Sequence, residues 1–149
     1  MVRIVPVRFR LKSPVFLIIS RSYAMRKIER QLTETVDKCL NGNYTKSFSK
    51  RLSKRDRIEY DHEGSQVTVF LWNSAIVKVD TKERSMIVQS CGYQSNTTKS
   101  RLNSFTRFFD PQGRGIFQKN WTWYLSTRCV LTGEHKPTEF KGKYEFPLV

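Results

Sequence analysis

The chain has 149 residues, with 27 Lys or Arg against 13 Asp or Glu, so its formal net charge is +14 at pH 7. This length suits one folded domain, and the 13% of aromatic residues supply enough large apolar surface to exclude a chain that is disordered throughout. The charge favours a polyanionic partner, nucleic acid more than an anionic membrane surface, although many basic proteins bind no specific partner.

The first 24 residues are basic and contain no acid. Their apolar run, residues 14–19, is too short to span a bilayer, so no membrane span is expected. We interpret residues 1–24 as a basic N-terminal extension or a loosely docked strand. A cleaved signal, an organelle transit peptide and an extension upstream of a natural start at Met25 are the alternatives.

A helix is predicted over about residues 25–40. Apolar residues recur at every fourth position from Ile28 to Leu40, and Gly42 follows as a stop signal. Alternating apolar residues then predict an antiparallel meander that contains a basic turn or loop at residues 50–57. The expected strands are residues 43–49, 57–61, 66–72, 75–80 and 86–91.

A second helix is predicted over about residues 97–109. Polar side chains at residues 96–98 can accept hydrogen bonds from the helix start, and Pro111 ends the helix after Asp110. The helix has two different faces, one apolar (Leu102, Phe105, Phe109) and one polar and basic (Lys99, Ser100, Asn103, Arg107).

A C-terminal β-hairpin at about residues 115–126 completes a single domain over residues 25–128. Residues 129–149 are predicted to form an irregular tail or an edge strand. The order of helix, meander, helix and hairpin predicts an α+β fold, with both helices on one face of a twisted antiparallel sheet.

Four pieces of the chain are typical of one group of viral proteins. They are Met25-Arg26-Lys27-Ile28-Glu29, Asn41-Gly42-Asn43, the central residues 91–103, and Gln118-Lys119 with Trp123-Tyr124-Leu125. In the central piece a strand ends in Gly-Tyr, a Thr-Thr pair begins a helix and Arg-Leu-Asn follows. Over about residues 25–125 the chain resembles a family of small proteins of unassigned function encoded by tailed phages and prophages.

The resemblance implies a viral origin and a small, non-secreted domain, but no mechanism. The chain departs from the family pattern in residues 1–24, in a longer basic insert around residues 50–57, and in the tail after Arg128.

No catalytic, metal-binding or cofactor-binding motif is visible. His62 and His135 lack a neighbouring nucleophile, the acids are scattered, and no Walker motif is present. The cysteines are an odd number without metal-ligand or disulfide spacing, which favours a reducing cytosol (Cys39, Cys91, Cys129). We expect a protein that is not an enzyme and that needs no cofactor or metal; a hydrolase with an unrecognised site is a remote alternative.

Nucleic-acid binding has three candidate surfaces. The basic cluster at residues 50–57 offers phosphate contacts without base readout. The polar face of the second helix could follow a phosphate backbone or could simply be solvated. The last hairpin interleaves aromatic and basic residues that could stack bases, although its tryptophans are more typical of a core. The candidate contacts are Lys50, Arg51, Lys54, Arg55, Lys99, Asn103 and Arg107.

Arg101 is expected to have a structural role, since it lies at the edge of the apolar face near Phe105 and Phe108. Its stem could lie along that surface with the charged group in water. Alternatively, the guanidinium could pair with a buried carbonyl or acid and fix the helix on the sheet.

The sequence therefore predicts a small, basic, non-enzymatic phage-type protein that binds DNA or RNA, mainly through phosphate contacts, in the cytoplasm of the host cell. The alternative is a protein-binding effector that modulates a host protein through exposed aromatic residues, without catalysis.

Overall fold

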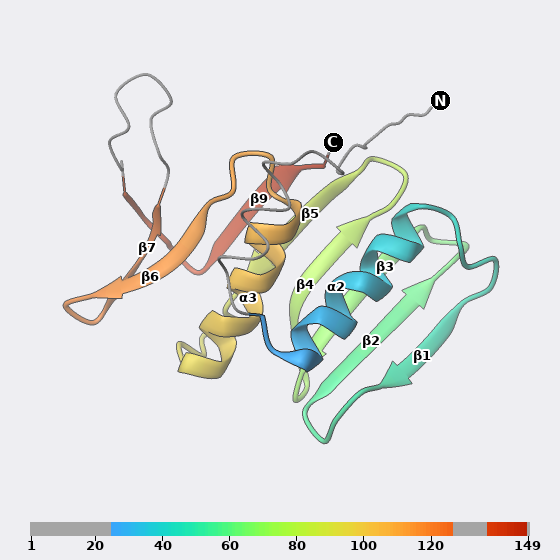
Figure 1. The fold of residues 1–149 in the computed structure, drawn as a ribbon, viewed down its shortest axis with the longest axis horizontal. Coiled ribbons are helices and arrows are strands. Elements are labelled where there is room, and N and C mark those ends of the chain that lie inside the picture. The colour runs from blue at the N-terminus through green and yellow to red at the C-terminus, as the bar shows by residue number, and fades with distance from the viewer. Residues whose placement is uncertain (1–24, 127–136, 149) are drawn as a thin grey trace.

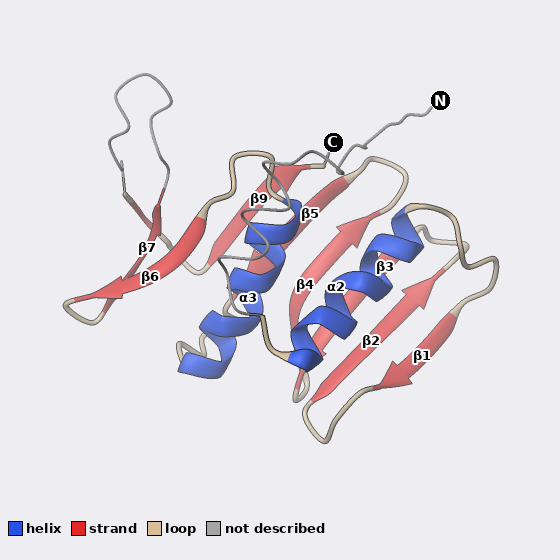
Figure 2. Ribbon diagram, in the orientation of Figure 1, coloured by secondary structure: helices blue, strands red, loops and turns tan. Residues whose placement is uncertain are grey.

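In the part of the chain that the structure describes, the protein folds into two antiparallel sheets and two helices (Figure 1, Figure 2). The computed structural model describes residues 25–126 and 137–148. The larger sheet has the strand order β1-β2-β3-β4-β5-β9, and the smaller sheet has the order β6-β7-β8. The strands are β1 (Phe48–Arg51), β2 (Asp56–Asp61), β3 (Gln66–Leu71), β4 (Ser74–Asp80), β5 (Ser85–Gln89), β6 (Gly115–Lys119), β7 (Thr122–Ser126), β8 (Thr138–Glu139) and β9 (Lys143–Pro147).

Helices α2 (Lys27–Leu40) and α3 (Asn96–Phe109) lie side by side on one face of the larger sheet (Figure 1). The apolar stripe of each helix packs against inward-facing side chains of the strands, and burial of this surface is the main force that holds the two layers together. The predicted α+β class and the shared face of the helices are confirmed. Core residues include Leu32, Val36, Ile58, Val67, Val69, Met86, Val88, Leu102 and Phe105.

The start of α3 differs by one residue from the prediction. Ser95 is the N-cap, and its hydroxyl oxygen accepts a hydrogen bond from the backbone N–H of Thr98 at 3.1 Å. The predicted cap residues Asn96, Thr97 and Thr98 are therefore the first turn of the helix. A serine three residues before Thr98 satisfies the same rule of helix capping, and the sequence alone did not distinguish between neighbouring polar residues.

Strand β9 decides between the two forms predicted for the C-terminal residues, an irregular tail and an edge strand. It pairs antiparallel with β5, so Phe146 lies opposite Met86 and Tyr144 opposite Val88. Phe146 is buried in the main core. Residues 143–147 of the tail are therefore the edge strand that was one of the two predictions, in the six-stranded sheet. Residues 127–136 of the predicted tail and the predicted extension at residues 1–24 lie outside the described residues.

The small sheet is attached to the main body through α3. The side-chain amide of Asn103 donates to the carbonyl of Ile116 at 2.8 Å, and its oxygen accepts from the N–H of Ile116 at 2.6 Å. This pair of hydrogen bonds mimics a strand partner for β6. The predicted hairpin at about 115–126 corresponds to β6 and β7, with β8 added as a third strand.

Within the described ranges, neither helix combines the length and the apolar character that crossing a membrane requires.

Replacing Phe105 by Ala should lower the free energy of unfolding by about 3–5 kcal/mol, because the fully buried ring leaves a cavity between α3 and the sheet. Trp121→Ala is the control: Trp121 is 88% exposed, and its removal should change the stability by no more than about 0.5 kcal/mol. Urea unfolding followed by circular dichroism measures both. Equal effects of the two substitutions would contradict the assigned core.

Candidate functional site

A buried ion cluster joins the two helices to strand β2. The guanidinium of Arg101, on α3, donates from Nε to Asp56 Oδ1 (2.7 Å) and from Nη2 to Asp56 Oδ2 (3.1 Å). Its Nη1 donates to Glu29 Oε2, on α2, at 2.9 Å. Each of the three residues is only 1% exposed. Of the two roles expected for Arg101, the structure therefore shows pairing with buried acids and not a charged group in water.

Every carboxylate oxygen of this cluster accepts at least one hydrogen bond. Besides Arg101, Ser100 Oγ donates to Glu29 Oε2 (2.5 Å), and the backbone N–H of Arg26 donates to Glu29 Oε1 (3.3 Å). Ser53 Oγ donates to Asp56 Oδ2 at 2.7 Å. A buried ion cluster stabilises a fold only when its remaining polar atoms are satisfied, and this one meets that condition.

Asp56 and Arg101 are ionised at neutral pH. Burial by itself would raise the pKa of Asp56, but hydrogen bonds from Arg101 and Ser53, together with the charge of Arg101, lower it below its ordinary value of 3.8. For Arg101, burial would lower the pKa, whereas the hydrogen bonds and charges of Asp56 and Glu29 raise it. Asp56 therefore stays a carboxylate and Arg101 a cation.

The same cluster fixes the turn between β1 and β2. Ser53 Oγ accepts from the backbone N–H groups of Arg55 (3.2 Å) and Asp56 (3.1 Å). Arg51 Nη1 donates to the carbonyl of Lys54 at 2.9 Å. The backbone of the turn is thus held from both sides, and the side chains of Lys54 and Arg55 are exposed.

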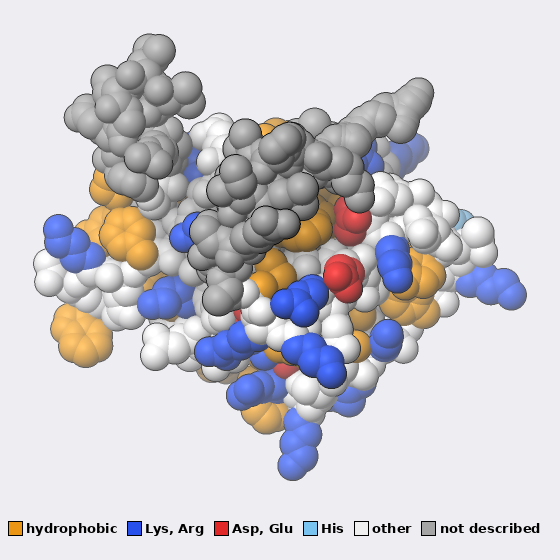
Figure 3. Space-filling model, in the orientation of Figure 1, with side chains coloured by type: hydrophobic (Ala, Val, Ile, Leu, Met, Phe, Trp, Pro, Cys, Tyr) orange, Lys and Arg blue, Asp and Glu red, His pale blue; other side chains and the backbone are white. Residues whose placement is uncertain are grey.

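Basic side chains from another segment lie beside this turn. Ile28, in the first turn of α2, lines the same surface hollow as Lys54 and Arg55. The neighbouring residues Arg26 and Lys27 are exposed. Figure 3 shows Lys and Arg side chains gathered at the lower end of the view, where Figure 1 places the β1–β2 turn and the beginning of α2. We call this group the basic end (Arg26, Lys27, Lys54, Arg55).

Five of the predicted contact residues lie at or near the basic end. Lys50, Arg51, Lys54 and Arg55 are all exposed along the β1–β2 hairpin, but Lys50 and Arg51 belong to edge strand β1 and not to a loop as predicted. Lys99 is half-buried in the first turn of α3, next to the serine that contacts Glu29 of α2.

Two members of the predicted stripe of Lys99, Asn103 and Arg107 contact the small sheet. Asn103 is engaged with Ile116 of β6, as described above. The guanidinium of Arg107 packs against Gly115, with Nη2 only 2.7 Å from the position that a Cβ would occupy there. The polar face of α3 thus joins the helix to the small sheet and to α2, and the nucleic-acid contacts of Asn103 and Arg107 stay predictions.

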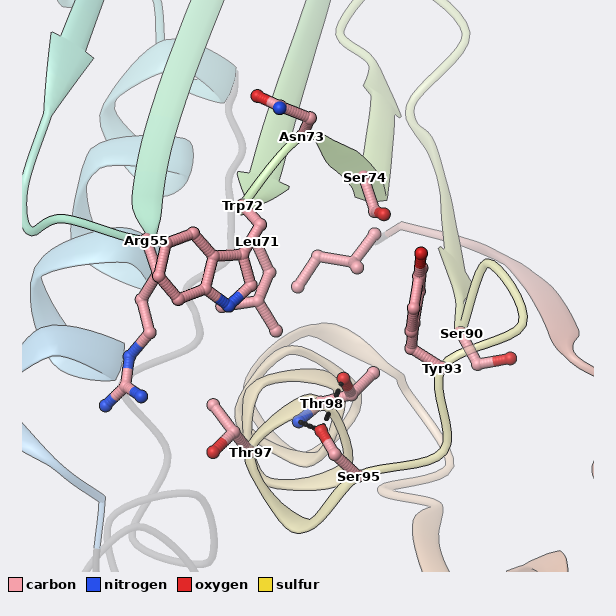
Figure 4. A pocket seen from close by; sticks show the side chains of 11 residues that line it. Arg55, Leu71, Trp72, Asn73, Ser74, Ser90, Tyr93, Ser95, Thr97 and Thr98 are labelled. Atoms are coloured by element: carbon pink, nitrogen blue, oxygen red, sulfur yellow. Dashed lines mark hydrogen bonds between the residues drawn. The ribbon is translucent and has the colours of Figure 1, made fainter.

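A cavity of about 480 Å³ lies next to the basic end, between the β3–β4 turn and the beginning of α3. Trp72 and Tyr93 flank it on opposite sides, and Arg55 lies beside Trp72 (Figure 4). Leu71 and Ile76 form its apolar part, and both are nearly completely buried.

The aromatic walls of this cavity are unusually open to solvent. Trp72 is 62% exposed and Tyr93 is 66% exposed. The backbone N–H of Trp72 donates to the carbonyl of Arg55 at 2.6 Å, so the tryptophan and the basic turn are held together. Trp72 also has a φ of +57°, which is uncommon for a bulky residue.

Sequence reasoning missed Trp72 and Tyr93 as exposed residues. Trp72 follows an alternating strand and Tyr93 precedes a helix, and aromatic residues at both kinds of position are often buried in a core. It also treated the tryptophans of the last hairpin as one group. Trp123 is buried against Phe140, whereas Trp121, in the turn between β6 and β7, is 88% exposed. A hairpin-turn position was the available signal for Trp72 and Trp121, since turn side chains point away from a sheet.

The structure gives no catalytic arrangement among the residues it describes. His62 Nδ1 lies 2.8 Å from the Tyr60 hydroxyl. Burial raises the pKa of the Cys39 thiol to about 12, and burial also raises that of Cys91, so both thiols stay protonated at neutral pH. In the two described ranges, no three His, Cys, Asp or Glu side chains converge as a metal site requires. His135 lies outside them.

The comparison with protein families identifies the chain. The sequence profile of a phage protein family, described as Kyanoviridae Gp96 protein, matches residues 25–147. The chain belongs to this family. The match extends beyond the predicted resemblance and includes β8 and β9, while residues 1–24 precede it. No curated protein and no solved structure matches the chain.

The lowered pKa of Asp56 predicts a specific loss of stability in acid. Because the folded state binds this proton less readily than the unfolded state, the stabilisation is present above about pH 4 and is lost as the pH falls through the folded pKa. In Asp56→Asn, stability at neutral pH should be lower and its fall between about pH 4 and pH 2 less steep. Urea unfolding at a series of pH values measures this.

Asp61→Asn is the control for this experiment, since Asp61 is an exposed carboxylate at the other end of the same strand. It should keep the acid dependence of the wild-type protein. An unchanged acid dependence in Asp56→Asn would show that this carboxylate contributes nothing to it.

Proposed function

We propose that this phage protein is a non-enzymatic nucleic-acid-binding protein that acts in the host cytoplasm and contacts phosphates with its basic end. The observation that carries the proposal is that Lys54, Arg55 and the exposed Trp72 line one surface hollow with Ile28 of α2. The exposed Arg26 and Lys27 directly precede Ile28, so two basic segments meet at this surface. Basic residues around an aromatic side chain are the usual composition of a surface that binds a nucleic-acid strand.

The placement of these charges supports an anionic partner. Arg26 is the N-cap of α2, Lys27 is its first residue, and Lys99 lies in the first turn of α3, which contains no acid. Positive charges at a helix N-terminus oppose the helix dipole and lower helix stability slightly. The acid in the first turn of α2, Glu29, is already paired with Arg101. A phosphate bound here would relieve this repulsion.

The chemistry of the basic end favours binding that tolerates many sequences. Lys54 and Arg55 extend from a turn whose backbone is fixed, so they can reach phosphates without entering a groove. Such contacts release counterions, and the affinity should fall steeply as the salt concentration rises.

Reversing two charges of the basic end tests this proposal. In the double variant Lys54→Glu, Arg55→Glu, the slope of log affinity against log salt concentration should decrease by about two, because each lost phosphate contact removes about one released counterion. Electrophoretic mobility shifts with DNA and RNA strands across a salt series measure the slope.

The matched control is Lys82→Glu, Lys119→Glu, which reverses two exposed lysines in turns or strand ends away from the basic end. It gives the same net charge but should leave the slope nearly unchanged. An equal effect of both double variants would show that only the overall charge matters. A complete lack of shift at low salt would contradict nucleic-acid binding itself.

One observation favours the alternative function, a protein-binding effector that modulates a host protein. Trp121 is 88% exposed in the β6–β7 turn, and Phe117 of the same hairpin is 36% exposed. Exposed tryptophans are frequent anchors of protein interfaces. If this function holds, Trp121→Ala should abolish capture of one defined host protein from a lysate, while the charge-reversal variant of the basic end should retain it.

A further inference from the structure

The cavity beside the basic end has the dimensions and walls of a ligand site. Its volume of about 480 Å³ lies within the range of about 300–1,000 Å³ that is usual for small-molecule pockets. Two aromatic side chains flank it, and two buried aliphatic side chains, Leu71 and Ile76, form its apolar part. An apolar hollow between two exposed aromatic rings leaves a large area that a flat ligand could remove from water.

The backbone holds Trp72 in this exposed position. Its φ of +57° lies in the left-handed region, where glycine or asparagine is favoured and a bulky side chain is disfavoured. The hydrogen bond from its N–H to the carbonyl of Arg55 keeps it there. Trp121 shares this turn conformation, so what distinguishes Trp72 is that its turn places the ring at the edge of the cavity.

The polar groups around the cavity favour a base over an apolar peptide. Arg55 is at its edge, and hydroxyl or amide side chains such as Asn73, Ser90 and Thr97 line the remainder (Figure 4). Among the described residues that line the cavity, none is acidic. Amides and hydroxyls can form hydrogen bonds with the edges of a base, and the arginine can hold the adjacent phosphate.

We propose that this cavity accommodates one unstacked base of a single-stranded nucleic acid, between Trp72 and Tyr93, while Arg55 and Lys54 hold the neighbouring phosphates. This inference rests on the proposed function and adds a preference for single strands to it. The bases of a duplex are stacked and paired, so they cannot enter such a cavity without being flipped out. Base–aromatic stacking depends little on sequence.

Two variants with one matched control test the cavity. Trp72→Gly removes the ring at a position where glycine is conformationally favoured, and Tyr93→Ala removes the opposite wall. Trp121→Gly is the control, because Trp121 is also exposed, also in a hairpin turn and also at positive φ (+68°). The probes are fluorescein-labelled oligo-dT, oligo-rU and a DNA duplex of the same length, with affinities measured by fluorescence anisotropy at several salt concentrations.

The wild-type protein should bind the single strands more tightly than the duplex. Trp72→Gly and Tyr93→Ala should each weaken single-strand binding by about five- to a hundredfold, the range for loss of one base–aromatic stack. They should leave the salt slope and the duplex affinity unchanged, because the phosphate contacts remain. Trp121→Gly should change none of these values.

The failure of this inference can be distinguished from the failure of the proposed function. If the protein binds single strand and duplex equally, or if the cavity variants weaken both alike, the base site is refuted while nucleic-acid binding stands. If neither strand nor duplex binds at low salt, the proposed function is refuted and the base site with it. Thermal unfolding of each variant shows whether it is folded, and Tyr93→Ala, in a different loop, tests the site independently of Trp72→Gly.

Discussion

The interaction on which the remainder of this structure depends is the buried contact of one arginine with two acids. Through Arg101, α3 forms ion pairs with Glu29 of α2 and with Asp56 of the sheet. Taking three charged groups out of water is costly, and removal of one partner from such a cluster typically costs about 3–5 kcal/mol. Its hydrogen bonds are directional, so the cluster fixes the relative position of three elements that apolar contacts alone would allow to slide.

This constraint also explains why the exposed surface has its form. Asp56 serves the core through its carboxylate and, with Ser53, holds the turn that presents Lys54 and Arg55. The conformation of the turn is therefore set from inside the protein by Asp56, together with the exposed hydrogen bonds of Arg51 and Ser53. Asp56 thus connects the buried ion cluster to the turn that carries Lys54 and Arg55. A ligand that binds these two side chains would meet a backbone with little freedom to rearrange.

Features that follow a periodic pattern of apolar residues were predicted from the sequence. Features that depend on one tertiary contact were not. Helix periodicity located Leu102 and Phe105 correctly, because an apolar face must be buried whatever lies beneath it. Periodicity could not show that Asn103 hydrogen-bonds to β6, because a side-chain amide can form its hydrogen bonds with water as well as with backbone groups. Likewise Trp121 and Trp123, two positions apart, would share a face if both lay on one strand, but Trp121 lies in the β6–β7 turn and only Trp123 belongs to β7. Strand β9 was weakly predicted because its alternation of apolar and polar residues is short, and the pairing with β5 that makes it a strand is not visible in the sequence.

The position of β9 has a consequence for the order in which the protein folds. Strands β1 to β5 are each connected to their neighbour by a short turn, whereas β9 reaches β5 only after α3 and the small sheet have intervened. Closing a long loop costs more chain entropy than closing a hairpin, so contacts between distant segments form more slowly. The meander can thus assemble from neighbouring strands first. Pairing of β9 with β5, which places Phe146 opposite Met86, is therefore expected to follow formation of the meander.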